Sequence, residues 1–344
     1  MRWRRAMFAP LCLWGAAAWG QAESRFVPPA GRVLHIAGQD RESFGEYVRT
    51  LCAGRDGLPM PAGAAFYTSL ALTGMESAHA NLPGDNHQDL PFLLRQSEHM
   101  ALQFALYLDA SQLEGVRQGR FDASIDRLAE FFRRCRRPVY FRIGYEFDGP
   151  HNGYDPEQYK GAYRHIADRL RKAGVDNLAY VWHSYALQPT HGGHDPMAWW
   201  PGDGYVDWVG VSFFQATGEG KHALNRARLL EIARAQKLPV MICEASAIRE
   251  TAAQRKLTGQ ALWDFWYVPF FEFIEGNAEV RAFSIINCDW HSQKQFAALG
   301  WGDGRVTADP VAAHNWRGKM REKRYLHGGK ELFGLLGWRG PRGQ

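Results

Sequence analysis

The stretch that decides the fold is Val139-Tyr-Phe-Arg-Ile-Gly-Tyr-Glu-Phe-Asp-Gly149. It begins as an apolar, β-prone run and ends in a glutamate, Glu146, among glycines and aromatic residues. A carboxylate at the end of a buried strand is costly unless it is paired, hydrogen-bonded or open to a cleft. In a barrel of parallel strands, the carboxyl end of each strand faces the functional site. The stretch therefore predicts a buried strand that delivers Glu146 to such a site.

Seven more apolar runs of the same kind occur along the chain: Val33–Ala37, Ala64–Thr68, Leu102–Tyr107, Leu178–Trp182, Trp208–Ser212, Val240–Cys243 and Val280–Ile286. Near-continuous apolarity is typical of strands that are covered on both faces, as in a parallel sheet. Helical patterns lie between them, at Phe44–Leu51, Ile125–Cys135, Pro156–Gly174, Leu224–Gln236 and Leu257–Ile274. Alternation through eight units predicts the α/β class and a single-domain (β/α)8 barrel. A doubly wound open sheet is the alternative, although no glycine-rich phosphate turn follows the first run.

The first 22 residues have the pattern of a secretory signal peptide. A basic start, Met1–Arg5, precedes an apolar stretch that ends in small residues. That stretch is too short for a stable membrane span. We therefore expect removal of residues 1–22, a barrel domain over residues 23–344, a secreted or periplasmic location, and no membrane association after cleavage.

The charge and composition exclude several classes of protein. The chain has 41 basic and 36 acidic residues, and removal of residues 1–22 leaves 38 and 36. Nucleic-acid binding is not expected, because it requires a basic face interleaved with base-stacking aromatics. A hydrophobic content of 46% argues against disorder. The chain has 13 tryptophans, 13 tyrosines and 20 phenylalanines. Most of these rings would pack in the core, and those at loop tips would stack on the faces of sugar rings. We expect a monomer.

A second strand-end glutamate follows in Leu238-Pro-Val-Met-Ile-Cys-Glu244. It lies three strand–helix units after Glu146, so both carboxylates reach the same mouth of a barrel. Two carboxyl groups about 5–5.5 Å apart can flank a glycosidic bond, one as nucleophile and one as acid. The competing interpretation is structural, since a strand-end glutamate also holds an arginine or caps a helix.

Five motifs, in this order and spacing, resemble glycoside hydrolase family 26, the β-mannanase-type branch of the clan A barrels. They are Arg142–Gly149, Tyr159–Arg164, Asn177–Trp182, Trp200–Gly210 and Leu238–Glu244. The resemblance implies a retaining glycoside hydrolase that cleaves a β-linked polysaccharide by double displacement and needs no cofactor. It also implies that Glu146 is the acid/base and Glu244 the nucleophile.

Two positions depart from the family pattern. Tyr145 stands where the family usually has a histidine before the acid/base. The run Ser212-Phe-Phe-Gln215 has no ring hydroxyl where a tyrosine commonly contacts the nucleophile. The expected substrate is therefore a mannan-type polysaccharide or a related β-glycan. A non-catalytic carbohydrate-binding barrel and a metal-dependent hydrolase are the alternatives.

Further residues at strand ends are candidates for substrate binding: Arg142, Tyr145, Asp148, Trp182, His183, Phe214, Trp290, Gln39 and Tyr67, with Asp109 beside them. Trp182 fits a stacking platform or the barrel core equally. His183 would bond sugar or a catalytic carboxylate, unless it is structural. The resemblance favours Trp290 as the floor of a sugar subsite.

Metal and disulfide sites have weaker support. His191 and His194 are spaced H-x-x-H in a glycine-rich loop rather than on a helix, so no metal is expected. The four cysteines after residue 22, Cys52, Cys135, Cys243 and Cys288, permit disulfides by their even number. Cys243 and Cys288 lie in or beside apolar runs, where buried thiols are expected.

Overall fold

The computed structural model describes residues 24–80, 86–186, 189–215, 221–248, 256–297 and 300–340, without the side chains of 221–224 and 294–295. The expected signal peptide, residues 1–22, lies outside the described residues. Within these ranges, no helix has the length and apolar composition needed to cross a membrane.

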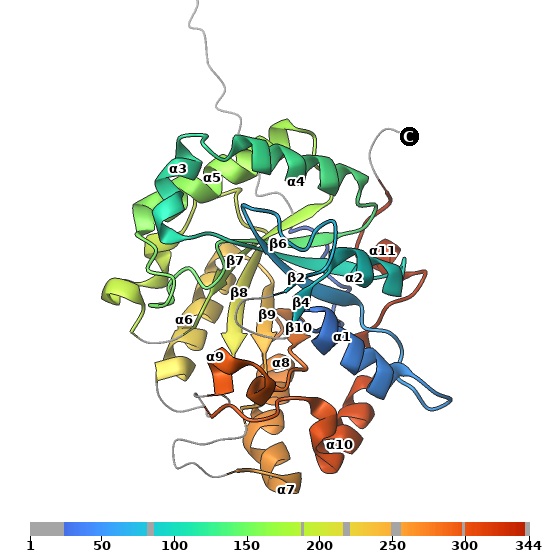
Figure 1. Ribbon diagram of the computed structural model, residues 1–344. Coiled ribbons are helices and arrows are strands. Elements are labelled where there is room, and N and C mark those ends of the chain that lie inside the picture. Colours follow the sequence, from blue (N-terminus) through green and yellow to red (C-terminus); the bar gives the residue numbers. More distant parts are fainter. Residues whose placement is uncertain are drawn as a thin grey trace, which may run out of the picture.

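Eight parallel strands close into a barrel (Figure 1). They are β1 (Val33–Ala37), β2 (Gly63–Ser69), β5 (Ala101–Tyr107), β6 (Val139–Ile143), β7 (Leu178–Ser184), β8 (Trp208–Phe213), β9 (Val240–Ala245) and β10 (Val280–Ile285). The ring closes because β10 pairs with β1, with Leu34 opposite Ala282. Every strand matches a predicted run, which confirms the (β/α)8 barrel and excludes the open sheet.

The helices lie around the strands (Figure 1). They are α1 (Arg41–Tyr47), α2 (Leu90–Gln96), α3 (Leu113–Arg117), α4 (Asp122–Arg134), α5 (Pro156–Lys172), α6 (Lys221–Gln236), α7 (Gly259–Leu262), α8 (Val268–Gly276), α9 (Lys294–Ala297), α10 (Pro310–Met320) and α11 (Leu332–Leu335). Three short strands complete the described set: β3 (His79–Ala80) pairs with β4 (His87–Gln88), and β11 (Tyr325–Leu326) pairs with β1.

The predicted helix over Leu257–Ile274 is found as continuous helical backbone from Gly259 to Gly276, with a π-helical turn inside it. This turn, Trp263–Tyr267, lies between α7 and α8, and Pro269 lies in the first turn of α8. Proline has no N–H to donate, so it is tolerated best where a new helical segment begins. The helix predicted from Pro156 is found as α5, and Asp155 caps it by accepting a hydrogen bond from the Gln158 N–H.

Side chains alternate between the inside of the barrel and the helix layer, as the strand period of two requires. On β6, Tyr140 belongs to the cluster inside the barrel, and Val139 and Phe141 belong to the cluster under the helices. Arg142, two residues after Tyr140, therefore points inward. Near the carboxyl ends of the strands, the inner layer turns from apolar to polar.

Candidate active site

Glu146 and Glu244 meet at the carboxyl end of the barrel. One carboxylate oxygen of each, together with a ring nitrogen of His183, lie within 4.8 Å of one another. Glu146 is 6% exposed and Glu244 is 8% exposed, so both carboxyls are largely withdrawn from water. The structure thus brings together the two strand-end glutamates that are 98 residues apart in sequence.

A β-bulge turns Glu244 toward the barrel axis. Val211 is opposite Ile242, but the next residue, Ser212, is opposite Glu244, so Cys243 is an extra residue in β9. A bulge changes the face on which the following side chain lies. Met241 and Cys243 lie inside the barrel, and strict alternation would place Glu244 under the helices. The extra residue brings its carboxylate inside instead.

Arg142 on β6 contacts Glu244 on β9 across the inside of the barrel. Its Nη1 lies 2.7 Å from Glu244 Oε1, and the guanidinium is fully buried. The rings of Tyr67 and Tyr145 lie over it, with centroids 4.7 and 5.2 Å from its Cζ. Aromatic faces stabilise a desolvated cation. Arg142 therefore supplies the fixed positive charge beside Glu244.

Glu146 lies in a tight turn directly after β6. Its φ is 53°, in the left-handed region that residues with a Cβ avoid. The Asn152 side chain holds this turn by donating to the carbonyls of Tyr145 and Glu146, at 2.9 and 3.0 Å. The Gly149 N–H donates to the Glu146 carbonyl at 2.9 Å. Backbone strain of this kind persists where the surroundings impose it, which is common at functional sites.

A continuous chain of hydrogen bonds joins the two carboxylates. Arg142 Nη1 donates to His183 Nδ1 at 3.2 Å, so His183 carries its proton on Nε2 and donates to Ser212 Oγ at 3.0 Å. Ser212 Oγ in turn donates to Glu146 Oε1 at 2.5 Å. Burial and the Arg142 charge lower the pKa of His183 well below its usual value. A neutral imidazole therefore connects the cation at Glu244 to the hydroxyl at Glu146.

Glu244 has a raised pKa. Burial raises the pKa of Glu244 to about 7, the nearby Glu146 adds to the rise, and Arg142 opposes it. Arg142 donates directly to Glu244, whereas Glu146 meets a hydroxyl and an imidazole. The direct hydrogen bond from Arg142 favours the ionised form of Glu244 and so opposes the effect of burial.

The structure places some predicted binding residues in other roles. Arg142 and His183 are fully buried, and they contact the network of the carboxylates rather than the open mouth. Trp182 is also fully buried, stacked on Phe147 at 4.3 Å, which corrects its prediction as a platform. Asp148 is 1% exposed.

Asp148 organises the loop after β7. Its carboxylate accepts hydrogen bonds from Ser184 Oγ at 2.6 Å and from the Tyr185 N–H at 2.7 Å. Burial raises its pKa to about 6, and these hydrogen bonds oppose the rise. These contacts give Asp148 a structural role in the loop, and its contact with substrate stays a prediction.

The remaining predicted residues lie around the mouth. Tyr145 and Tyr67 are half-buried, with ring centroids 5.4 Å apart. Gln39 is half-buried at the end of β1, and its carbonyl accepts a hydrogen bond from Gln88. Phe214 is half-exposed beside Trp301, at 5.3 Å between centroids. Their contact with substrate stays a prediction.

Trp290 lies in the loop after β10 and is only 2% exposed. Its indole N–H donates to Ser246 Oγ at 2.8 Å, and its ring packs against Phe296 and Trp301. Little of the ring is therefore open to a sugar in this structure. The half-exposed Trp301 is the more accessible tryptophan of this cluster.

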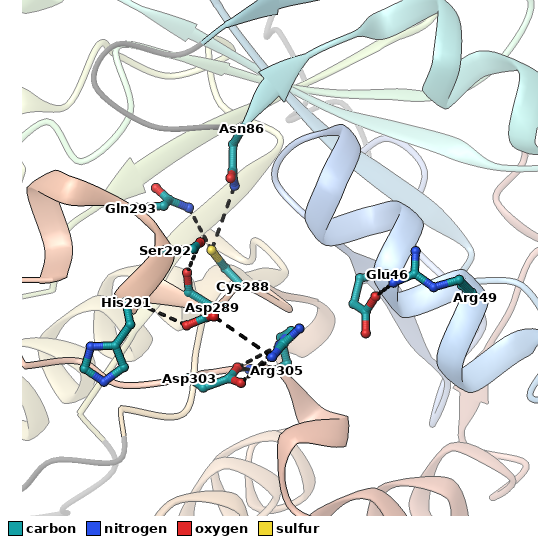
Figure 2. Close-up of polar contacts among 10 residues, drawn as sticks. All are labelled: Glu46, Arg49, Asn86, Cys288, Asp289, His291, Ser292, Gln293, Asp303 and Arg305. Carbon is teal, nitrogen blue, oxygen red and sulfur yellow. Dashed lines mark hydrogen bonds and ion pairs between the residues drawn. The ribbon is translucent and has the colours of Figure 1, made fainter.

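Polar contacts anchor the loop that carries Trp290, as Figure 2 shows. Cys288 Sγ accepts a hydrogen bond from Gln293 at 2.7 Å and contacts the Asn86 amide at 3.9 Å. Arg305 pairs with Asp303 at 2.6 Å and lies 4.0 Å from Asp289. The Asn86 contact joins this loop to a segment 202 residues away in sequence. The four cysteines Cys52, Cys135, Cys243 and Cys288 are free thiols.

Sequence reasoning missed two residues that touch Glu146. Ser212 lies on β8 at an inward position, and only its distance from Glu146 shows its role. His151 lies in the loop after β6, with Nε2 at 2.9 Å from Glu146 Oε2. No sequence signal marks His151, because nothing in a Gly-Pro-His-Asn run fixes where the imidazole points.

Glu146, His183 and Glu244 have the spacing of a metal-binding group. Their contacts do not fit that use. Both ring nitrogens of His183 are engaged in hydrogen bonds, and the Arg142 guanidinium lies against Glu244. A buried cation directly beside a ligand carboxylate would oppose a second cation.

The closed barrel and its paired strand-end glutamates define a barrel glycosidase. The family model of glycosyl hydrolase family 26 matches residues 77–253. The chain is 32% identical to a β-1,3-xylanase from an Alcaligenes species over 337 residues, covering 92% of this chain and 69% of that protein. It is 31% identical to the β-1,3-xylanase TXYA from a Vibrio species over 335 residues, covering 92% and 70%. The protein belongs to glycosyl hydrolase family 26.

Solved structures support the same fold. An endo-β-1,4-mannanase double mutant from Cellulomonas fimi matches with a TM-score of 0.60 at 15% identity, covering 87% of this chain and 72% of that one. A family 26 β-mannanase from Bacteroides ovatus matches with a TM-score of 0.58 at 16% identity, covering 88% and 93%. These likenesses concern the fold alone. Membership of family 26 makes the protein a glycoside hydrolase that acts on a β-linked polysaccharide.

Proposed function

We propose that the protein is a retaining glycoside hydrolase that cleaves β-1,3-linked xylan. The observation that carries the mechanism is the spacing of Glu146 and Glu244, whose nearest carboxylate oxygens are within 4.8 Å. Retaining enzymes have carboxyl groups about 5–5.5 Å apart, whereas inverting enzymes leave about 6.5–9.5 Å for a water molecule. The short gap between the two carboxylates supports the first arrangement.

Glu244 is the nucleophile in this proposal. Its carboxylate attacks the anomeric carbon and forms a glycosyl ester, while Glu146 donates its proton to the departing glycosidic oxygen. Water then attacks the same carbon, Glu146 takes the proton of that water, and the Glu244 carboxylate leaves. Arg142 supports the role of Glu244 as nucleophile, because its positive charge favours the ionised form of that carboxylate. Neither step requires a cofactor.

The choice of β-1,3-xylan follows from the two relatives, which are named β-1,3-xylanases and align with 92% of this chain. The departures at Tyr145 and Phe214 from the mannanase pattern agree with a substrate other than mannan. Aromatic rings that are open to solvent follow the carboxyl ends of several barrel strands. Tyr107, 37% exposed, lies 6.2 Å from Tyr145, and Phe214 lies beside Trp301. We assign these rings to stacking on sugar.

Export is part of the proposal and rests on the sequence of residues 1–22. An enzyme that acts on a polysaccharide meets its substrate outside the cytoplasm. Comparison of the N-terminus of the secreted protein with the encoded one tests the assignment. An N-terminus near residue 23 is expected, and retention of Met1 in an exported product would contradict it.

The deciding experiment incubates the purified protein with β-1,3-xylan, β-1,4-xylan, mannan and mixed β-glucans and measures the release of reducing ends. We expect activity on β-1,3-xylan that persists in chelator. Proton NMR of the first product should show the β-anomer before mutarotation. An α-anomer would overturn the retaining mechanism, and activity confined to mannan would overturn the substrate. Binding without hydrolysis of any of them would indicate a carbohydrate-binding barrel.

A further inference from the structure

His151 occupies the outer side of the acid/base. Its Nε2 lies 2.9 Å from Glu146 Oε2, and its side chain is 48% exposed while that of Glu146 is 8% exposed. The imidazole packs edge-on against Tyr185, with ring centroids 5.0 Å apart. The loop after β6 thus carries a histidine from the solvent edge directly onto the carboxylate.

The two oxygens of Glu146 have different surroundings. Oε1 accepts from Ser212, which is tied through His183 and Arg142 to Glu244. This inner oxygen belongs to a buried network, so it is poorly placed to meet a substrate. The outer oxygen, Oε2, is the one that the half-exposed His151 contacts. A general acid must place a proton within hydrogen-bond reach of the leaving oxygen, so Oε2 is the atom that donates.

The charges around His151 determine how it competes for that proton. Burial opposes protonation of its imidazole, but the hydrogen bond to Glu146 and the charges of Glu146, Glu244 and Asp148 outweigh burial and raise the pKa of His151. Its other titratable neighbour, Tyr185, has a pKa raised to about 12 by burial and by the two glutamates. The His151 imidazole therefore competes with the Glu146 carboxylate for the proton that Glu146 donates in the first chemical step.

We propose that His151 is a positioning residue that holds the outer oxygen of Glu146 in the free enzyme and yields its place to the leaving-group sugar. When the sugar displaces the imidazole, the proton of this hydrogen bond passes to Glu146 Oε2 and His151 leaves as the neutral imidazole. His151 thereby sets the upper pH limit at which free enzyme can protonate a leaving group. This inference rests on the proposed role of Glu146.

The test compares His151→Gln with His314→Gln, an exposed histidine on α10 that leaves the site untouched. The measurement is the pH profile of kcat/KM on β-1,3-xylo-oligosaccharides, which reports the groups of the free enzyme. Loss of the competing imidazole should move the basic limb of His151→Gln upward by about one pH unit. His314→Gln should follow the wild type. A basic limb unmoved in His151→Gln, or moved downward, would overturn the proposal.

An NMR titration gives a readout that does not require turnover. The His151 imidazole resonance, assigned by its loss in His151→Gln, should titrate at higher pH in the wild type than in Glu146→Gln. Added β-1,3-xylobiose should lower that titration point in the wild type. Equal titration in wild type and Glu146→Gln would exclude the pairing. Failure of the proposed function is separate, because it would appear as full activity of Glu146→Ala.

Discussion

Arg142 on β6 and Glu244 on β9 form a fully enclosed ion pair at 2.7 Å across the inside of the barrel. Two further nitrogens of Arg142, Nε and Nη2, are buried, and no hydrogen bond to them is found among the residues that the structure describes. Its charge is therefore balanced chiefly by Glu244, and the aromatic faces of Tyr67 and Tyr145 add to that stabilisation. The nucleophile of the proposed mechanism depends on this one cation.

Arg142→Met should lower both stability and activity. Removal of one partner leaves a buried charge uncompensated, which costs about 3–5 kcal/mol. Thermal and denaturant unfolding measure the loss of stability, and kcat/KM should fall because Glu244 then ionises less readily. Arg49→Met is the matched control, since the Arg49–Glu46 pair shown in Figure 2 is at the surface. Arg49→Met should change stability and kcat/KM little, because an exposed ion pair contributes little free energy. Equal effects of the two changes would contradict the role of Arg142.

Glu146→Ala should separate the two chemical steps. An aryl glycoside with a good leaving group needs little protonation, so its first step should survive. Release of the glycosyl enzyme should become slow, because no base activates water. Azide should restore turnover and give a β-glycosyl azide, detected by NMR. Rescue that yields only the α-azide would assign Glu146 as the nucleophile instead.

Glu244→Ala should abolish the covalent path. Activity should fall by several orders of magnitude on good and poor leaving groups alike. Azide should give an α-glycosyl azide, because the small nucleophile enters in place of the carboxylate. The loss of activity is measured as steady-state rates on both substrate classes. Circular dichroism checks that the variant is folded. Normal activity of the folded variant on β-1,3-xylan would place the site elsewhere.

Acid should destabilise the barrel through His35. This side chain is fully buried, with Nδ1 at 3.4 Å from His327 Nδ1 and Nε2 without a hydrogen-bond partner. Burial and the neighbouring His327 lower the pKa of His35, and burial lowers that of His327. The unfolded chain binds these protons near pH 6.5, so stability is complete above that pH and falls as the pH drops below it.

The corresponding measurement is the Tm of wild type and His35→Leu between pH 8 and pH 5. The variant should lose less stability over this range, because it has one fewer buried group to protonate. At pH 8 it should be close to wild type, since an apolar side chain suits the surrounding Tyr47, Phe283 and Trp316 rings. A parallel decline of both proteins would contradict the assignment.

Cys243→Ala should retain most activity. The Cys243 thiol is fully buried, and burial raises its pKa to about 12, so it is not a nucleophile near neutral pH. Its position in the bulge is a backbone feature that alanine can adopt. A modest loss of stability is expected from the missing sulfur atom. Loss of most of kcat/KM in a folded Cys243→Ala protein would show that the thiol has a role in catalysis.

Local sequence was sufficient for the eight strands and for Glu146. Apolar β-prone runs alternating with helices through eight units favour the closed barrel over the open sheet, and a glutamate placed just after such a run reaches the mouth of the barrel. The ring of Trp182 shows the limit of this reasoning. Its strand-end position fits an open platform, but Phe147 and the neighbouring tryptophans cover it.

The sequence by itself determined the barrel, its polar end and the two glutamates as candidates, because these follow from periodicity and from the cost of burying charge. Only the tertiary structure decided how the glutamates meet. Alternation along β9 would send Glu244 outward, and the bulge at Cys243 returns it to the axis opposite Arg142. The contact of His151 with Glu146 depends on the path of a loop. Bulges and loop paths arise from packing between segments distant in sequence, so no local pattern encodes them.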